Sequence, residues 1–199
     1  MAACLGLMAV SIPETATPSP GAYSVPLSPS RPDQALFDKA LLHFANEARR
    51  KHGRPPLASD PALARAASDH AKNMARLGKQ SHTLPVRGQK TLKQRIKRQS
   101  VSFRLAGENL SMDKVYRLAG RPISTGYSGC NFRYTGTNAQ VPIHTYATLA
   151  EDLVDRWLAS PKHRQSLLSR QFTRTGSGFG IDPGGVACGD VYAVQTFAD

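Results

Sequence analysis

The hydrophobic pattern of this chain changes its period once, and the change limits the folds that the chain can adopt. In several segments before residue 168, apolar residues recur at steps of three and four, which is the spacing of amphipathic helices. Residues 176–181 and 190–197 instead alternate with a period of two, which is typical of strands. The turn sequence Asp182-Pro-Gly-Gly185 separates these two segments. Helices followed by an antiparallel pair predict an α+β protein.

The helical part of the chain divides at recognisable start signals. Asp60 is the expected N-cap of the second segment. Thr148 and Glu151 have the spacing of a capping box. Residues 101–110 favour neither a helix nor a strand, and residues 112–143 are expected to be irregular. We expect helices over residues 33–52, 61–77, 91–98, 148–160 and 161–168.

The N-terminus has the composition of an export signal followed by a linker. Residues 1–12 resemble the apolar core of a secretory signal peptide, and the missing positive start is consistent with a start codon further upstream. Residues 13–32 are rich in Pro, Ser, Thr and Ala, which is typical of a linker. These features predict a folded domain over residues 33–199 in a secreted or periplasmic protein.

The cysteines allow one disulfide. Cys4 lies in the signal-like segment, and its removal leaves Cys130 and Cys188 as an even pair in an exported chain. A bridge between them would close a loop of about 58 residues and stabilise the fold by about 4 kcal/mol in the chain-entropy model. Two free thiols in a reducing compartment are the alternative.

The net charge of +12 has a local origin. Between Asp69 and Glu108 there is no acidic residue, whereas ten cations lie there: Lys72, Arg76, Lys79, Arg87, Lys90, Lys93, Arg95, Lys97, Arg98 and Arg104. Such a face implies an anionic lipid or a cell-wall polymer as partner. A solvated face that keeps the protein soluble is the alternative. Nucleic acid fits poorly, because Phe103 is the only aromatic residue there and no readout motif is present. We expect the partner to contact the cations between residues 87 and 98: Arg87, Lys90, Lys93, Arg95, Lys97 and Arg98.

Three short segments combine residues that commonly carry chemistry. They are Ser81-His82-Thr83, Gly107-Glu108-Asn109 and Trp157-Leu-Ala-Ser160-Pro-Lys-His163-Arg164. Each is weak alone, but their order and intervals together are specific. On these segments the chain resembles the CAP superfamily of cysteine-rich secretory proteins, antigen 5 and pathogenesis-related 1 proteins, over about residues 34–198. The Ser-Pro-x-His-Arg form is similar to the bacterial branch of that superfamily.

The resemblance implies a three-layer α-β-α sandwich with a central antiparallel sheet and a cleft that holds two histidines and two glutamates. By position the histidines are His82 and His163, and the first glutamate is Glu108. Ser160 stands where the second glutamate is expected, three residues after Trp157. Two imidazoles and one carboxylate can bind a divalent metal such as zinc, with a water or Ser160 filling the gap. The resemblance also implies that the cleft can take a small or lipidic ligand.

The same residues allow interpretations without a metal. Glu108 can set the tautomer of a histidine as an acid–base pair, or it can belong to a buried polar network that binds nothing. A metal-dependent hydrolase acting on peptide or cell-wall bonds is the alternative function. A hydrolase built from Ser160, His163 and Glu108 is disfavoured, because the chain has no nucleophile elbow. A secreted binding module, and not an enzyme, is therefore the leading expectation. Three further motif residues are expected to be structural: Asn109, Trp157 and Arg164.

Overall fold

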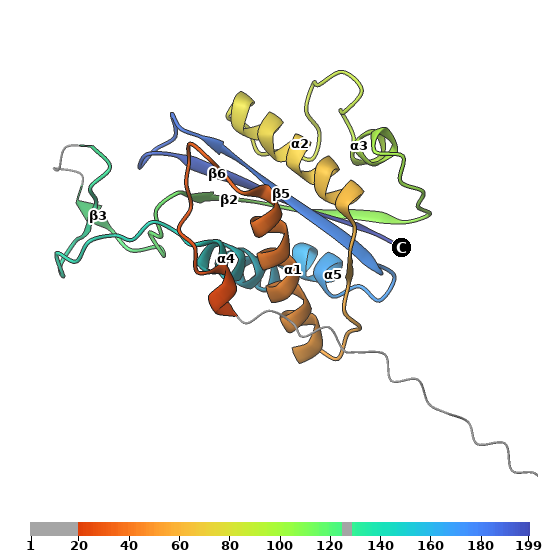
Figure 1. Ribbon diagram of the computed structural model, residues 1–199, viewed down its shortest axis with the longest axis horizontal. Helices are drawn as coiled ribbons and strands as arrows, with labels where there is room; N and C mark the ends of the chain where they lie inside the picture. The colour runs from red at the N-terminus through yellow and green to blue at the C-terminus, as the bar shows by residue number, and fades with distance from the viewer. Residues whose placement is uncertain (1–19, 125–128) are drawn as a thin grey trace, which may run out of the picture.

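A computed structural model describes residues 20–124 and 129–199 of the 199-residue chain. These residues form a central sheet with helices on both of its faces (Figure 1). The signal-like segment 1–12, with Cys4, lies outside the described residues. The elements follow one another in the order η1 (Pro20–Tyr23), α1 (Gln34–Lys51), β1 (Ala58–Ser59), α2 (Pro61–Leu77), α3 (Leu92–Arg98), β2 (Ala106–Lys114), β3 (Ile123–Ser124), β4 (Arg133–Tyr134), α4 (Tyr146–Ala159), α5 (Pro161–Leu167), β5 (Arg174–Asp182) and β6 (Asp190–Ala198).

The main sheet has the strand order β1-β5-β6-β2. The predicted antiparallel pair, β5 with β6, is confirmed, and β2 joins β6 as a third long antiparallel strand. The short β1 instead runs parallel to the start of β5, with Ala58 opposite Arg174. The three long strands are thus antiparallel, as expected, and the parallel two-residue β1 makes the sheet mixed. β1 stays short because α2 begins at Pro61 and carries the chain onto the sheet face.

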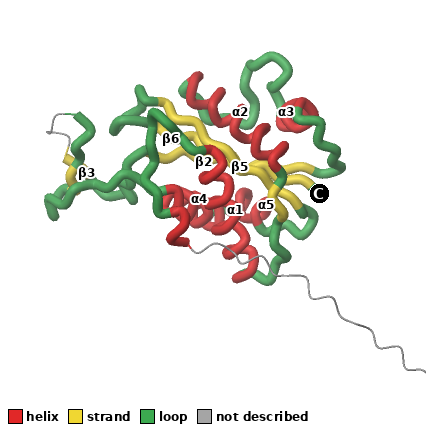
Figure 2. Tube along the Cα trace, in the orientation of Figure 1, coloured by secondary structure: helices red, strands yellow, loops and turns green. Residues whose placement is uncertain are grey.

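Helices cover the sheet in two layers, which confirms the predicted three-layer sandwich. α2 and α3 pack on one face, and α1, α4 and α5 pack on the other (Figures 1 and 2). α2 lies directly on β5, because Gly176, Gly178 and Gly180 present no side chain to it. A Cβ at Gly178 would lie 2.3 Å from backbone atoms of Ser68 in α2. The alternate glycines of β5 are therefore a packing requirement of this layer.

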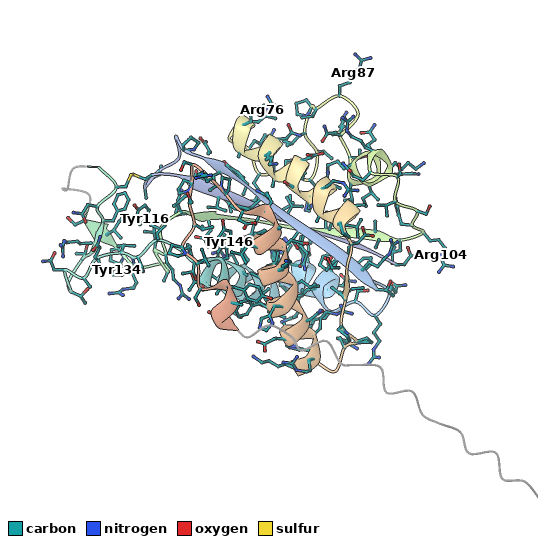
Figure 3. The ribbon with its side chains drawn as sticks, viewed as in Figure 1. Arg76, Arg87, Arg104, Tyr116, Tyr134 and Tyr146 are labelled. Carbon is teal, nitrogen blue, oxygen red and sulfur yellow. A yellow bond between two sulfur atoms is a disulfide. The ribbon has the colours of Figure 1, made fainter. Side chains whose placement is uncertain are left out.

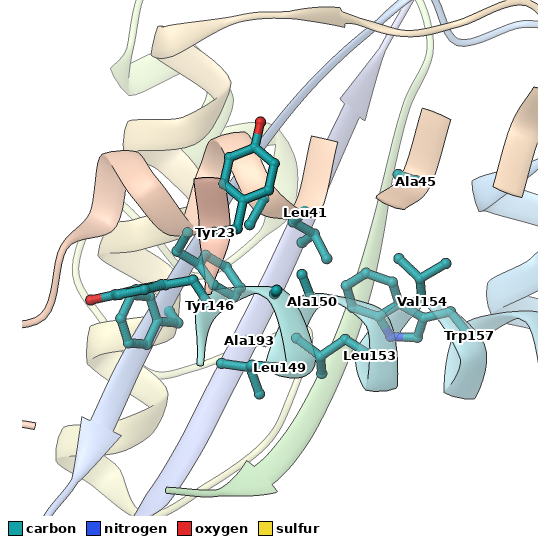
Figure 4. Packing of buried hydrophobic residues seen from close by; sticks show 14 of the residues in the cluster. Tyr23, Leu41, Ala45, Tyr146, Leu149, Ala150, Leu153, Val154, Trp157 and Ala193 are labelled. Carbon is teal, nitrogen blue, oxygen red and sulfur yellow. The ribbon is translucent and has the colours of Figure 1, made fainter. Parts of the chain in front are cut away.

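The largest core cluster lies between the sheet and the helices α1 and α4 (Figure 4). Trp157 is fully buried there, and its indole N–H donates to the carbonyl of Leu110 in β2 at 3.1 Å. Tyr23 and Leu27 belong to the same cluster. The packed part of the chain therefore begins upstream of residue 33, inside the stretch that we expected to be a linker.

The start of α4 differs from the prediction. Thr145 is the N-cap: its hydroxyl accepts from the amide of Thr148 at 3.1 Å, and the Thr148 hydroxyl accepts from the amide of Thr145 at 3.0 Å. The predicted capping box of Thr148 with Glu151 is wrong, because a threonine takes the reciprocal role that a glutamate usually has. The other predicted helices agree with the structure to within one residue at each end.

The predicted disulfide between Cys130 and Cys188 is present, with their Cα atoms 5.8 Å apart. It ties the turn between β5 and β6 to a lobe that contains β3 and β4 and extends to one side of the sandwich (Figure 2). Phe132, Tyr134 and Val141 form a small core in this lobe. Two short strands and this small core thus lie within the stretch that we expected to be irregular. None of the helices formed by residues 20–124 and 129–199 is long and apolar enough to cross a membrane.

Candidate functional site

Glu108 lies at the centre of the candidate site and binds two partners. Its Oε1 pairs with Nδ1 of His82 at 2.9 Å, and its Oε2 accepts from the guanidinium of Arg95 at 2.7 Å. An ionised carboxylate only accepts hydrogen bonds, so Nδ1 of His82 carries the proton. The side chains of Arg95 and Glu108 are 1% and 2% exposed, whereas that of His82 is 58% exposed. A buried ion pair therefore supports a histidine that faces solvent.

β2 delivers residues to both sides of this site. Successive side chains of a strand point to opposite faces, so Glu108 faces the α2–α3 layer while Asn109 faces α5. The Asn109 amide donates to the carbonyl of His163 at 3.1 Å. Further along α5, Arg164 donates to the carbonyl of Leu158 at 3.3 Å and links α5 to α4. β2 is an edge strand of the main sheet, and both α3 and α5 contact it.

Arg95 connects three parts of the chain from its position in α3. Besides its bond to Glu108, its Nη1 donates to the carbonyl of His82 at 3.2 Å and to that of Gln89 at 3.3 Å. The guanidinium therefore holds β2, α3 and the loop over residues 82–89 together. No isolated feature of the sequence marks it as a site residue.

The burial of Arg95 corrects the expectation that this residue belongs to an exposed basic face. Leu92 and Ile96, one helical turn apart, pack into one apolar cluster. Arg95 lies three positions after Leu92 and therefore on the same side of α3. The spacing of Arg95 from Leu92 therefore indicated that Arg95 lies on the buried side of α3. It could not show the partner, because Glu108 is 13 residues away in the sequence.

The electrostatics of the site favour a charged carboxylate. Burial alone would raise the pKa of Glu108, but the hydrogen bond from His82 and the charge of Arg95 outweigh it, so that pKa lies below its ordinary value. Nearby in α2, Nε2 of His70 donates to the carbonyl of Ser81 at 2.9 Å. Burial lowers the pKa of His70 to about 4. At neutral pH, Glu108 is therefore charged and His70 is neutral.

His163 and Ser160 lie on the α5 side of the site. Ser160 is the N-cap residue of α5, but its hydroxyl makes no capping hydrogen bond. Burial, and next to it the charge of His82, lower the pKa of the half-buried His163. The structure thus brings His82 into direct contact with Glu108, whereas His163 is joined to the neighbouring Asn109 through its backbone carbonyl.

The arrangement does not fit the divalent metal that the resemblance implies. A metal would need a carboxylate oxygen directed at the two imidazoles, but each oxygen of Glu108 already binds another group. Within residues 20–124 and 129–199, no group of three or more His, Cys, Asp or Glu side chains is arranged to hold a metal ion. The groups that can still meet a ligand are the exposed His82 ring, through its Nε2, and the half-buried His163 ring.

A second feature, the basic face, covers the α2–α3 side of the molecule. Of the ten cations between residues 70 and 107, all except Arg95 are exposed. Figure 3 shows Arg76, Arg87 and Arg104 pointing away from the body of the protein. Arg104 pairs with Asp199 at 3.0 Å. The basic face is defined by Lys72, Arg76, Lys79, Arg87, Lys90, Lys93, Lys97, Arg98 and Arg104.

Comparisons with known proteins agree with this architecture. The model of the CAP family, described as the cysteine-rich secretory protein family, matches residues 42–197. An extracellular protein from Bacillus anthracis strain Ames that contains an SCP domain is 26% identical in structure-based comparison, with a TM-score of 0.55 over 81% of this chain. The match spans 40% of the length of that protein. An outer surface protein from Borrelia burgdorferi is 20% identical, with a TM-score of 0.55 over 83% of this chain and 95% of its own, and shares the fold. No curated protein sequence matches the chain.

Proposed function

Because this chain belongs to the CAP family of cysteine-rich secretory proteins, we propose that it is an exported binding module whose basic face holds an anionic polymer of the cell envelope. The Bacillus anthracis protein that shares its domain is an extracellular protein. The disulfide between Cys130 and Cys188 supports the same location, because disulfides persist in oxidising compartments.

The observation that carries the proposal is the lack of acidic residues among the cations of the basic face. From residue 70 to residue 107 the sequence contains no Asp or Glu. Of the acidic residues that border this stretch, Asp69 is half-buried and Glu108 is buried, and Asp199 is bound to Arg104. A concentrated positive field of this kind attracts polyanions from a distance, and it weakens as salt is added.

A linear polymer suits the basic face better than a membrane does. α3 turns Leu92 and Ile96 toward the interior, where they pack with other apolar residues. The helix therefore presents no apolar side that could insert between lipids. Binding would rest on charge, which suits a chain of repeated phosphate or carboxylate groups.

A metal-dependent hydrolase, the alternative function, has less support in the geometry. Glu108 is the carboxylate that would have to ligate the metal or activate a water. Its two oxygens are instead occupied by His82 and Arg95. We assign no catalytic role to these residues.

Binding of the full, oxidised chain to inorganic polyphosphate, measured by calorimetry at several salt concentrations, tests the proposal. We expect saturable binding that weakens steeply with salt. The triple variant Lys93→Gln/Lys97→Gln/Arg98→Gln should lose roughly a hundredfold in affinity, because each cation near a dense negative surface contributes about 1 kcal/mol.

The matched control removes the same charge from the opposite side of the sheet. Arg31→Gln/Lys39→Gln/Lys51→Gln changes three exposed cations on and just before α1, and it should leave the affinity nearly unchanged. An equal loss in both triple variants would mean that only net charge matters and would remove the basic face as a defined site. Tighter binding to phosphatidylglycerol vesicles or to a DNA duplex than to polyphosphate would also contradict the proposal.

A further inference from the structure

The carboxylate of Glu108 has no oxygen that is free of a partner. Oε1 binds Nδ1 of His82 at 2.9 Å, and Oε2 binds Arg95 at 2.7 Å. With 2% of its side chain exposed, Glu108 leaves little room for an ion to approach the remaining lone pairs. The contact with Glu108 also occupies one ring nitrogen of His82, so Nε2 alone of that ring is open to a ligand.

Arg95 is held in place by more than Glu108. Its guanidinium also donates to the backbone carbonyls of His82 and Gln89, and 1% of the side chain is exposed. An arginine keeps its charge at every pH at which proteins fold, so the negative charge of Glu108 is permanently neutralised. A divalent cation brought near this guanidinium would be repelled, and most strongly where water is excluded.

We infer that Arg95 is an internal cation that closes the site around Glu108 to divalent metals. It gives Glu108 the positive partner that a metal ion would otherwise provide. Ser160, where the family resemblance expects a second carboxylate, adds a hydroxyl in its place. The open donors are then the imidazoles of His82 and His163, fewer than the three protein ligands of a catalytic zinc site. Arg95 is thus a positioning residue that excludes divalent metals by pairing with Glu108.

This inference does not depend on polymer binding by the basic face. Arg95 is buried, whereas the nine residues of the basic face are exposed, so the two sites can be changed separately. The protein can fail to bind polyphosphate and still exclude zinc, or it can bind polyphosphate and also bind zinc. The two proposals can therefore fail separately.

Zinc titration of the full, oxidised chain tests the inference, with calorimetry and thermal unfolding as the two readouts. We expect no saturable zinc binding by the wild type at micromolar concentrations. The Arg95→Met variant leaves Glu108 without its cation and should bind one zinc ion at least about tenfold more tightly than the wild type does. Changes of this size are typical when a hydrogen-bond partner of a metal ligand is replaced. Zinc should then raise the melting temperature of this variant and not that of the wild type. Adding His82→Ala to Arg95→Met should abolish the gain.

Two control variants separate charge from structure. Arg95→Lys keeps a positive charge beside Glu108 and should still exclude zinc. Arg98→Met makes the same kind of change on the exposed side of α3 and should leave zinc binding as in the wild type. If Arg95→Met does not fold, Arg95→Gln, whose shorter amide leaves Oε2 of Glu108 without its charged partner, carries the same expectation.

Either of two results would overturn the inference. One is saturable binding of a single zinc ion by the wild type that is lost in both His82→Ala and His163→Ala. The other is a folded Arg95→Met or Arg95→Gln protein that binds zinc no more tightly than the wild type.

Discussion

Gly178 in β5 lies against the backbone of Ser68 in α2, with no room for a side chain between them. A Cβ on Gly178 would lie 2.3 Å from the amide nitrogen and the Cα of Ser68. Non-bonded heavy atoms pack best at about 3.5–4.0 Å, so α2 would have to move away. Because His70 belongs to the same helix, this contact also sets how closely the α2 layer approaches the site around Glu108.

Gly178→Ala should therefore lower the free energy of unfolding by about 3 kcal/mol, at the upper end of the usual cost of overpacking. Ser177→Ala is the neighbouring control. Its side chain faces the opposite layer, and its hydroxyl has no hydrogen-bond partner among the described atoms. Urea unfolding followed by circular dichroism should show a large loss for Gly178→Ala and a small change for Ser177→Ala. Similar values for the two would mean that α2 adjusts freely to the sheet.

The ion pair between Arg95 and Glu108 should behave as a coupled unit. Arg95→Met leaves a buried carboxylate without its cation and should cost about 3–5 kcal/mol of unfolding free energy. The double variant Arg95→Met/Glu108→Leu should recover most of this loss, since well-packed apolar residues can replace a buried ion pair with little cost. A double-mutant cycle by urea denaturation measures the coupling. Additive losses would show that the two side chains stabilise the fold independently.

The elements that could be predicted from the sequence are those whose signals are local. α1, α2 and α5 combine an apolar period with residues that begin or end a helix, and such signals lie within a few positions of one another. β2 was not predicted, because Gly107, Glu108 and Asn109 at its start are poor strand formers. It forms through pairing with β6, where Glu108 lies opposite Thr196, about 90 residues away in the chain.

The residues of the candidate site likewise fall into those that the sequence marks and those that only the structure reveals. His82, Glu108 and His163 could be named from the family resemblance, because their motifs are continuous in the sequence. Arg95 could not, because its role depends on a contact between α3 and β2. Its position among many exposed cations favoured an interpretation by charge, whereas the structure places it with the buried polar groups.

The disulfide between Cys130 and Cys188 should contribute a large part of the stability. The bridge spans 58 residues, for which loop closure predicts about 4 kcal/mol. Cys130→Ser/Cys188→Ser should therefore unfold at a clearly lower urea concentration than the oxidised wild type, and reductant should move the wild type toward the variant. If the sandwich unfolds at the same urea concentration without the disulfide, the lobe around Phe132 folds as a separate unit. The loop-closure entropy would then not contribute to the stability of the sandwich.

Side chains of α1 cover the part of β5 that extends beyond its pairing with β1. The amide of Ser177 donates to Oδ1 of Asp38 at 2.7 Å, and the amide of Phe179 donates to Oε1 of Gln34 at 3.1 Å. Burial raises the pKa of Asp38 to about 6, although the hydrogen bond from Ser177 opposes the shift. The folded state thus holds this proton more tightly than the unfolded chain does. The stabilising contribution of protonated Asp38 is complete below the ordinary aspartate pKa and is lost as the pH rises through about 6.

Asp38→Asn should therefore stabilise the protein at pH 8 and not at pH 4. The amide oxygen can still accept from Ser177, while the buried charge is removed, and the shift in pKa corresponds to a gain of up to about 3 kcal/mol. His70 acts in the opposite sense: its pKa is lowered to about 4, so its contribution is present above the ordinary histidine pKa and is lost as the pH falls toward 4. Only the difference between variant and wild type isolates Asp38, so both proteins are unfolded in urea at each pH. Asp155→Asn, at an exposed position of α4, is the control and should show no such dependence. An equal effect of Asp38→Asn at pH 4 and pH 8 would show that Asp38 does not titrate between them in the folded protein.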